Sequence, residues 1–323
     1  MYHCITIGDI KLDTFVVLHD ASLQCILKMP ECYLCIEYGK KIPVEAIDSQ
    51  IAGSSANVAV GLSRLRFKTA VVSVMGKDQT YELALERLAK EKVESKYIKT
   101  KPKEQSSFSV VINYKGEKTI LASHKAHEYR LPKLPKSAWF YVCELGSGYL
   151  SLFKSLLATL PANSTHLAIN PGAIQIQEQK SVLYNLIKKS SLLFLNVGEA
   201  RSLAKLQGSA KIPQIMAAAW RLNRKTVVIT DGRNGAYGFE GKQIFFVPTF
   251  PGKRVEATGA GDSFASGVLG AALHNLPLPE ALKWGAVNAA SVISQVGPQA
   301  GLLSAREIKR RLKTHPSFKT KTM

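Results

Sequence analysis

A regular alternation of strand-sized apolar runs with amphipathic stretches is the feature that most constrains this chain. From residue 51 onward, with one hairpin set aside, each apolar run is followed by a stretch with helical periodicity. Such alternation predicts a parallel sheet with helices on both faces. The run at residues 69–75 is apolar throughout, which is typical of a strand buried on both faces. The predicted fold class is α/β, a three-layer sandwich with a mostly parallel central sheet.

The expected elements follow one another along the chain. Strands are expected at residues 2–7, 69–75, 139–145, 166–170, 192–196, 226–230 and 242–248. Helices are expected from about residue 57 and at 81–92, 150–160, 181–189, 198–206, 213–223, 263–273, 279–294 and 304–313. The basic tail after Lys313 is expected to be disordered.

Two parts of the chain depart from the alternation and predict a second, smaller sheet. Residues 14–18 and 42–51 have strand character, and a hairpin with a short Lys-Gly turn is expected within 107–122. We expect a β-sheet lid formed from about 10–50 and 105–124, inserted in one domain that spans residues 1–323.

Composition bounds the class of protein. The chain has 323 residues, 46% of them hydrophobic, which is enough for a large core. The longest apolar runs are strand-sized and no secretory signal is evident, so we expect no membrane span and a cytoplasmic location.

Lys and Arg outnumber Asp and Glu by 43 to 24, a net charge of +19. The bases are scattered and accompany no nucleic-acid-binding motif, so a specific nucleic-acid function is not expected.

Three cysteines, Cys25, Cys32 and Cys35, lie close together in the sequence. Cys32 and Cys35 form a CxxC pair, and a zinc site would need Cys4 or His19 as a further ligand. Structural zinc sites normally show two ligand pairs. Three reduced thiols in a hairpin are therefore the favoured interpretation, and metal binding stays open.

The stretch VEATGAGDSFASGVLGA carries the strongest chemical signal. Residues 255–258 suit the end of a strand and residues 263–273 suit a helix, with a turn at Gly259 and Gly261 between them. A helix start with unpaired N–H groups favours bound phosphate. Asp262 lies at the same place, where it could accept a proton from a hydroxyl that attacks phosphorus, or simply cap the helix.

Other polar residues follow the predicted strands, at the edge where parallel sheets bind ligands. These residues are Asp9, Asp13, Asp78, Asn170, Asn196, Thr230 and Asp262. Singly, Asn57 and Asn196 could be helix caps, and Asp13 an exposed charge at a strand end. Their agreement in position favours a shared site.

Several segments together resemble the ribokinase, or PfkB, family of carbohydrate and nucleoside kinases. TGAGD at residues 258–262 is similar to the C-terminal signature of that family, and AGSSAN at 52–57 to its N-terminal element. NVGE at 196–199, ITDGRNGA at 229–236 and INPG at 169–172 also fit, in family order, across almost the whole chain.

This resemblance implies roles at the matching positions. Asp262 would be the catalytic base, and Gly259, Ala260 and Gly261 would form an anion hole. Asn196 and Glu199 would hold Mg²⁺, with Glu199 as the metal-binding carboxylate. The nucleotide would be contacted by Thr230, Gly232, Gly235 and Asn288. The acceptor hydroxyls would be bound by Asp13, Gly53 and Asn57.

This chain also departs from the family pattern. Ala52–Gly53 replaces a paired glycine, and Glu256 stands where an aspartate is frequent, which leaves a monovalent-cation site open. Lys11 stands where ribokinases tend to have Asn, and Glu144 is a further candidate for the acceptor site.

The favoured function is an ATP-dependent kinase that phosphorylates a hydroxymethyl group of a sugar, with Mg²⁺. The alternatives are a nucleoside (adenosine-like) kinase and a non-catalytic relative that binds a nucleotide or sugar. An exposed lid edge also suggests a homodimer through the lid.

Overall fold

A computed structural model describes residues 1–19, 21–25, 32–114, 117–160 and 165–323. Its main sheet has ten strands in the order β16-β15-β14-β13-β12-β11-β10-β1-β6-β7. These are β1 (Tyr2–Ile7), β6 (Thr69–Gly76), β7 (Glu94–Lys101), β10 (Ser137–Val142), β11 (His166–Ile169), β12 (Leu192–Asn196), β13 (Thr226–Thr230), β14 (Ala236–Phe239), β15 (Ile244–Val247) and β16 (Lys321–Thr322). Pairing is parallel from β7 to β13 and antiparallel from β13 to β16.

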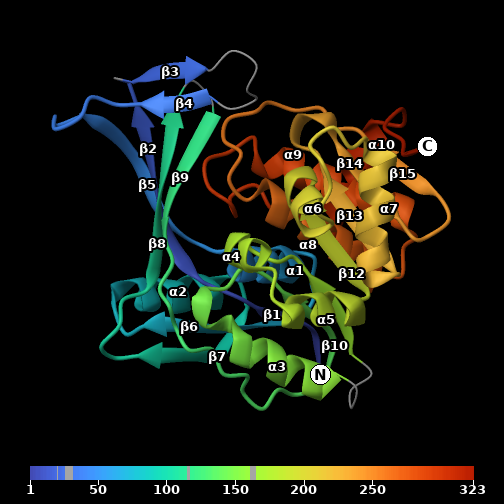
Figure 1. The fold of residues 1–323 in the computed structure, drawn as a ribbon, viewed down its shortest axis with the longest axis horizontal. Helices are drawn as coiled ribbons and strands as arrows, with labels where there is room; N and C mark the ends of the chain where they lie inside the picture. Colours follow the sequence, from blue (N-terminus) through green and yellow to red (C-terminus); the bar gives the residue numbers. More distant parts are fainter. Residues whose placement is uncertain (20, 26–31, 115–116, 161–164) are drawn as a thin grey trace.

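Helices cover both faces of this sheet, which confirms the predicted three layers (Figure 1). One face carries α1 (Ser54–Arg64), α2 (Gln79–Lys90), α8 (Ala260–Leu273), α9 (Leu278–Val292) and α10 (Ala305–Thr314). The other carries α3 (Leu150–Thr159), α4 (Ala173–Glu178), α5 (Ser181–Lys189), α6 (Val197–Leu203) and α7 (Ile212–Asn223). Short 3-10 turns lie at Ser147–Tyr149 and Gly232–Asn234.

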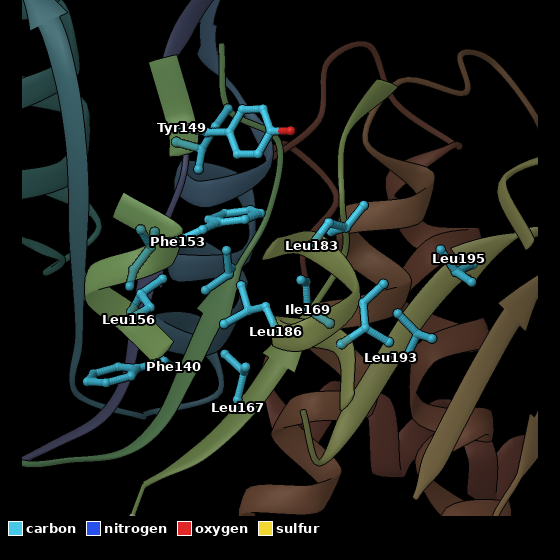
Figure 2. Close-up of a cluster of buried hydrophobic side chains, with 14 of the residues drawn as sticks. Phe140, Tyr149, Phe153, Leu156, Leu167, Ile169, Leu183, Leu186, Leu193 and Leu195 are labelled. Atoms are coloured by element: carbon cyan, nitrogen blue, oxygen red, sulfur yellow. The ribbon is translucent and has the colours of Figure 1, made fainter. Parts of the chain in front are cut away.

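Alternation of side chains along each strand divides the core into two apolar layers. In β12, Leu193 and Leu195 belong to the layer that holds α3 to α7, whereas Leu192 and Phe194 belong to the layer that holds α8 and α9. Figure 2 shows the first layer, in which Phe153 of α3 and the side chains of α5 meet the strands. Strands buried on both faces explain why the apolar runs in the sequence were continuous.

A separate four-stranded sheet has the order β5-β2-β8-β9. It contains β2 (Lys11–Leu18), β5 (Val44–Ala52), β8 (Ser107–Tyr114) and β9 (Glu117–Ser123), the segments from which a second sheet was predicted. Figure 1 shows this second sheet projecting from the layered body, with a hairpin of β3 (Ser22–Cys25) and β4 (Cys32–Cys35) at its far end.

Cysteine chemistry in that hairpin lies largely outside the described residues. The backbones of Cys25 and Cys32 pair across the hairpin, but their side chains are not among those that the structure describes. Cys35 is a free thiol whose Sγ lies near the carbonyl of Tyr33. The proposed zinc ligands therefore stay untested.

Three local predictions were wrong. The tail after Lys313 is ordered, because Phe318 is buried against Phe250 and β16 pairs with the edge strand β15. Residues 255–258 have no strand structure and lead into a turn at Thr258 and Gly259, and α8 begins at Ala260. Helix α1 begins at Ser54, so Asn57 lies inside the helix and is not its cap.

None of the helices in the described ranges is long and apolar enough to cross a lipid bilayer.

Candidate active site

Asp262 lies in the first turn of α8 and meets Asn57 of α1. The Asn57 Nδ2 donates to Asp262 Oδ2 at 2.8 Å, although 205 residues separate the two. Burial raises the pKa of the Asp262 carboxyl, and hydrogen bonds from Asn57 and Ser54 oppose that rise. The residue is only partly buried, so a ligand can reach it.

The glycine turn before Asp262 holds the start of α8 in place. Gly259 has φ +76°, and a Cβ there would lie 2.5 Å from the Pro298 side chain, so only glycine fits. The Ala260 amide donates to the Ala257 carbonyl at 3.3 Å, so it is partly occupied in this structure. Gly261 has open space where a Cβ would be, which leaves room for a ligand at its amide.

A cavity of about 370 Å³ opens directly beside this turn. Its wall includes Asn196, Thr230, Gly232, Gly235, Ala260 and Gly261, all predicted site residues. Phe250 and Phe264, with alanines of α9, add apolar side chains to the lining. A cavity that combines apolar side chains with the start of a helix suits a ligand with a flat base and phosphates.

Two glycines shape the wall contributed by the segment after β13. Gly235 has φ +105°, and a Cβ there would lie 2.3 Å from the Val247 carbonyl oxygen. Gly232 has φ +53° with no atom near its missing Cβ. Both glycines line the cavity, and any larger residue at position 235 would clash with the backbone of Val247.

Asn196 and Glu199 form a reciprocal cap at the start of α6. Asn196 Oδ1 accepts from the Glu199 amide, and Glu199 Oε2 accepts from the Asn196 amide, both at 2.8 Å. The capping alternative is thus what the structure shows, and it leaves Glu199 Oε1 available. Burial raises the pKa of Glu199, and a nearby cation would relieve that cost.

The structure places Asn288 away from the cavity. It is buried, its Nδ2 donates to the Ser263 carbonyl at 2.8 Å, and its Oδ1 accepts from the Leu303 amide at 3.0 Å. The α9 residues that line the cavity are Ala286, Ala289 and Ala290 instead. The side chain of Asn288 is used to tie α8 to α9 and not to face a base.

Asp13, predicted as a strand-end residue, lies inside β2 and is buried. Burial raises its pKa, while the ammonium of Lys11 opposes the rise. Gly53 has φ +99°, and a Cβ there would lie 2.4 Å from the Asp9 carbonyl oxygen. Gly53 therefore lets the start of α1 lie against the end of β1, and Asn57, one turn later in α1, meets Asp262.

A charged cluster lies where β1, β2 and β10 begin or end, and it joins Asp9, Lys11 and Glu144 to His124, which the sequence analysis did not name. Lys11 Nζ lies 3.2 Å from Glu144 Oε2, and His124 Nε2 lies 3.3 Å from Glu144 Oε1. Asp9 Oδ1 accepts from the Tyr129 hydroxyl at 2.5 Å. Contact with Asp9 raises the pKa of His124, burial opposes that rise, and Glu144 adds to it.

Lys118 of β9 also faces the site. Burial lowers the pKa of its ammonium, and the carboxylates of Glu256, Asp262 and Asp13 oppose that effect. No periodicity marks Lys118 or His124 as site residues, because each reaches the site only through the fold of the second sheet.

The Mg²⁺ site at Asn196 and Glu199 and the monovalent-cation site near Glu256 both stay predictions. Within the described ranges, no group of three His, Cys, Asp or Glu side chains is placed to hold a metal ion. Glu256 is buried, and its Oε1 accepts from the Thr258 amide and hydroxyl at 2.6 and 2.5 Å. Its Oε2 has no hydrogen-bond partner among the residues described, so a monovalent-cation site stays a prediction.

Asp78 serves the structure rather than the site. Its carboxylate accepts from the Tyr81 amide at 3.1 Å and from the Ser106 amide and hydroxyl at 2.8 Å. Although burial opposes it, these hydrogen bonds lower the pKa of Asp78.

Comparisons with known proteins agree over nearly the whole chain. Residues 14–305 match the model of the pfkB family carbohydrate kinases. A 5-dehydro-2-deoxygluconokinase of Geobacillus kaustophilus is 23% identical over 292 residues, 82% of this chain and 85% of that protein. A ribokinase of Haemophilus influenzae is 23% identical over 303 residues, 91% of this chain and 96% of that protein.

Solved structures share the fold. A protein of E. coli classed as a ribokinase II, in complex with ATP and Mg²⁺, has a TM-score of 0.78 and 19% identity, with 98% of this chain and 100% of that chain covered. A nucleoside kinase of Burkholderia thailandensis, in complex with inosine, has a TM-score of 0.77 and 16% identity, with 98% and 99% covered.

Proposed function

Because the chain belongs to the pfkB family of carbohydrate kinases, we propose that it transfers the γ-phosphoryl group of ATP to a hydroxymethyl group of a sugar. The observation that carries the proposal is the Asp262 carboxylate, held by Asn57 at the start of α8 beside a cavity of about 370 Å³. A nucleoside is the alternative acceptor within the same chemistry.

Asp262 acts as the general base. As the acceptor hydroxyl attacks the γ-phosphorus, its proton passes to Asp262 Oδ1, the carboxylate oxygen that does not face Asn57 Nδ2. The O–P bond to the acceptor forms while the bond to the ADP oxygen breaks, and the displaced electrons go to ADP. The hydrogen bond from Asn57 keeps the other carboxylate oxygen fixed, so that the accepting oxygen has one orientation.

The turn of Gly259, Ala260 and Gly261 stabilises the charge that develops on the transferring phosphoryl group. Its N–H groups and the positive end of α8 lie where a γ-phosphate would enter from the cavity. The Gly261 amide is more accessible than that of Ala260, since the Ala260 amide contacts the Ala257 carbonyl.

Asn196 and Glu199 fit a hydrated Mg²⁺. Glu199 keeps one carboxylate oxygen outside the cap, and Asn196 lies on the cavity wall, which suits a metal that retains most of its water. Bound there, Mg²⁺ would neutralise charge on the ATP phosphates. Thr230, Gly232 and Gly235 would border the nucleotide along the same wall.

Asp13, Gly53 and Asn57 hold the acceptor beneath the second sheet. Asp13 presents a buried carboxylate to a hydroxyl, and Gly53 brings backbone close without a side chain. The second sheet acts as a lid that excludes water, which would otherwise compete as acceptor.

We extend the proposal to assembly and location. One face of the second sheet exposes apolar side chains, among them Phe108 at 46% and Leu121 at 57%, and suits a homodimer through the lid. Sedimentation of a Leu121→Glu variant tests this, since the dimer should dissociate.

Use of ATP as co-substrate favours a cytoplasmic location, which cell fractionation would check.

An ADP-release assay over a panel of sugars and nucleosides tests the function. Asp262→Asn should lower turnover at least about a hundredfold with little effect on nucleotide affinity. Asp48→Asn, the same change on an exposed residue of β5, is the matched control. Absence of turnover with every acceptor, together with salt-sensitive RNA binding, would instead support a non-catalytic relative.

A further inference from the structure

A chain of hydrogen bonds leads from the candidate base to the far side of α1. Asn57 Nδ2 donates to Asp262 Oδ2 at 2.8 Å, and Gln299 Nε2 donates to Asn57 Oδ1 at 2.9 Å. Arg87 Nε of α2 donates to Gln299 Oε1 at 2.9 Å. The four side chains come from α2, the loop before α10, α1 and α8, and the two amides in the middle are buried.

The direction of this chain is fixed at its outer end. A guanidinium can only donate, so the Gln299 oxygen must face Arg87. A carbonyl can only accept, and Gln299 Nε2 also donates to the Ile51 carbonyl at 3.1 Å. Both neighbours therefore impose the same orientation on the Gln299 amide, with its NH₂ group toward Asn57.

Asn57 must then take the complementary orientation. Its Oδ1 accepts from Gln299, which leaves its NH₂ group to face Asp262. We infer that Gln299 is a positioning residue, which orients the Asn57 amide so that Asp262 always receives a hydrogen-bond donor and stays an ionised base. The inference rests on the proposed role of Asp262.

The loop that carries Gln299 has little freedom to move. Gln299 is 1% exposed, and its own carbonyl accepts from Arg64 Nη1 at 2.8 Å. The preceding Pro298 contacts Gly259, and Gly297 has φ +91° with Gln50 packed against it. One loop thus supports both the base, through Asn57, and the turn at Gly259.

Other charges also act on Asp262 and must be kept constant in any test. From the second sheet these are Lys11, Asp13 and Lys118. From the end of β10 they are Tyr141, Cys143 and Glu144. None of them contacts Gln299 in the described structure, so a change at Gln299 leaves them in place.

We call the chain of hydrogen bonds from Arg87 through Gln299 and Asn57 to Asp262 the relay, and Gln299→Glu should reverse the orientation of the Asn57 amide within it. The new carboxylate accepts only, so the Asn57 amide must turn its NH₂ group toward residue 299 and its oxygen toward Asp262. An acceptor facing a carboxylate favours the protonated acid, so the pKa of Asp262 should rise by at least about one unit. Carboxyl ¹³C NMR of selectively labelled aspartate in the unliganded protein measures this rise without any turnover, with Asp262→Asn used for assignment.

A double-mutant cycle separates relay from simple charge. In an Asn57→Ala background, Gln299→Glu should produce less than half the shift that it produces alone. Equal pKa shifts in both backgrounds would mean that the added charge acts on Asp262 through space, which would refute the relay. No pKa shift in either background would show that Gln299 does not influence Asp262. Gln295→Glu, the same change on an exposed residue four positions away, should leave the titration unchanged.

Kinetics give a second readout. The acid limb of the kcat/KM profile should move up with the NMR pKa in Gln299→Glu. If the NMR pKa moves and no acceptor is ever phosphorylated, the relay stands and the proposed function fails. Should Gln299→Glu not fold, Gln299→Met is the second variant, because it removes the donor that fixes the Asn57 amide without adding a charge. The Asn57 amide is then free to turn its oxygen toward Asp262, so the pKa of Asp262 should rise in the same direction, and an unchanged pKa in Gln299→Met would refute the proposed role of Gln299.

Discussion

Gly259 and Gly261 are two residues apart, and alanine should have opposite effects on stability at the two positions. At Gly259, φ is +76° and a Cβ would lie 2.5, 2.6 and 3.0 Å from atoms of Pro298. The left-handed conformation costs about 1–2 kcal/mol for a residue with a Cβ, and overpacking adds about 1–3 kcal/mol. Gly259→Ala should therefore lower the free energy of unfolding by about 2–5 kcal/mol.

At Gly261 the same methyl group meets nothing within 4 Å and φ is not positive. Alanine in a helix stabilises by about 0.5–1 kcal/mol relative to glycine, so stability should hold or rise slightly. The methyl group lies on the cavity wall, however, where the phosphates are expected. Gly261→Ala should lower kcat/KM at least about tenfold, since small displacements of reacting groups are costly.

Thermal unfolding and steady-state kinetics on the same preparations check both expectations. For 323 residues the unfolding entropy near Tm is about 0.7 kcal/mol/K, so Gly259→Ala should lower Tm by about 3–7 °C. Gly208→Ala, where a Cβ also meets nothing within 4 Å, is the control and should change neither quantity. Equal stability of all three variants, or full activity of Gly261→Ala, would refute the account of this turn.

Three further outcomes are expected. Asp262 must be ionised to accept a proton, and burial raises its pKa above the value of about 3.9 for an exposed aspartate. The rate of the wild-type protein should therefore already decrease with falling pH at pH values above about 3.9. A wild-type rate that stays constant down to that pH would contradict this. Glu199→Gln should raise the Mg²⁺ concentration needed for half-maximal rate by about tenfold, with exposed Glu82→Gln as control. Phe318→Ala should lower the free energy of unfolding by about 3–5 kcal/mol. It should also weaken ADP binding, because Phe318 packs against Phe250, which lines the cavity. Calorimetry measures both properties, and Met323→Ala, a change on an exposed residue, should alter neither.

The central sheet could be predicted from the sequence because its strands are apolar on both faces. The bounds predicted for α5, β12 and β13 agree with the structure residue by residue. Strand β7 was missed, since Glu94–Lys101 is a polar edge strand without an apolar run. The tail was misjudged because its basic composition hid one aromatic anchor, Phe318.

The candidate site could be predicted only in part. Residues in short motifs, such as Asn196, Thr230 and Gly261, are adjacent to the cavity as expected. The contact between Asn57 and Asp262 depends on how α1 packs on α8, and no local pattern encodes it. His124 and Gln299 were missed for the same reason, because each meets its partners only after distant segments have folded together.

A crystal structure with a non-hydrolysable ATP analogue and the acceptor found in the ADP-release panel tests the central claim most directly. The account predicts an acceptor hydroxyl within about 2.6–3.2 Å of an Asp262 carboxylate oxygen, with the γ-phosphate at the Gly261 amide. An acceptor hydroxyl bound away from Asp262, or phosphates bound away from the start of α8, would contradict it.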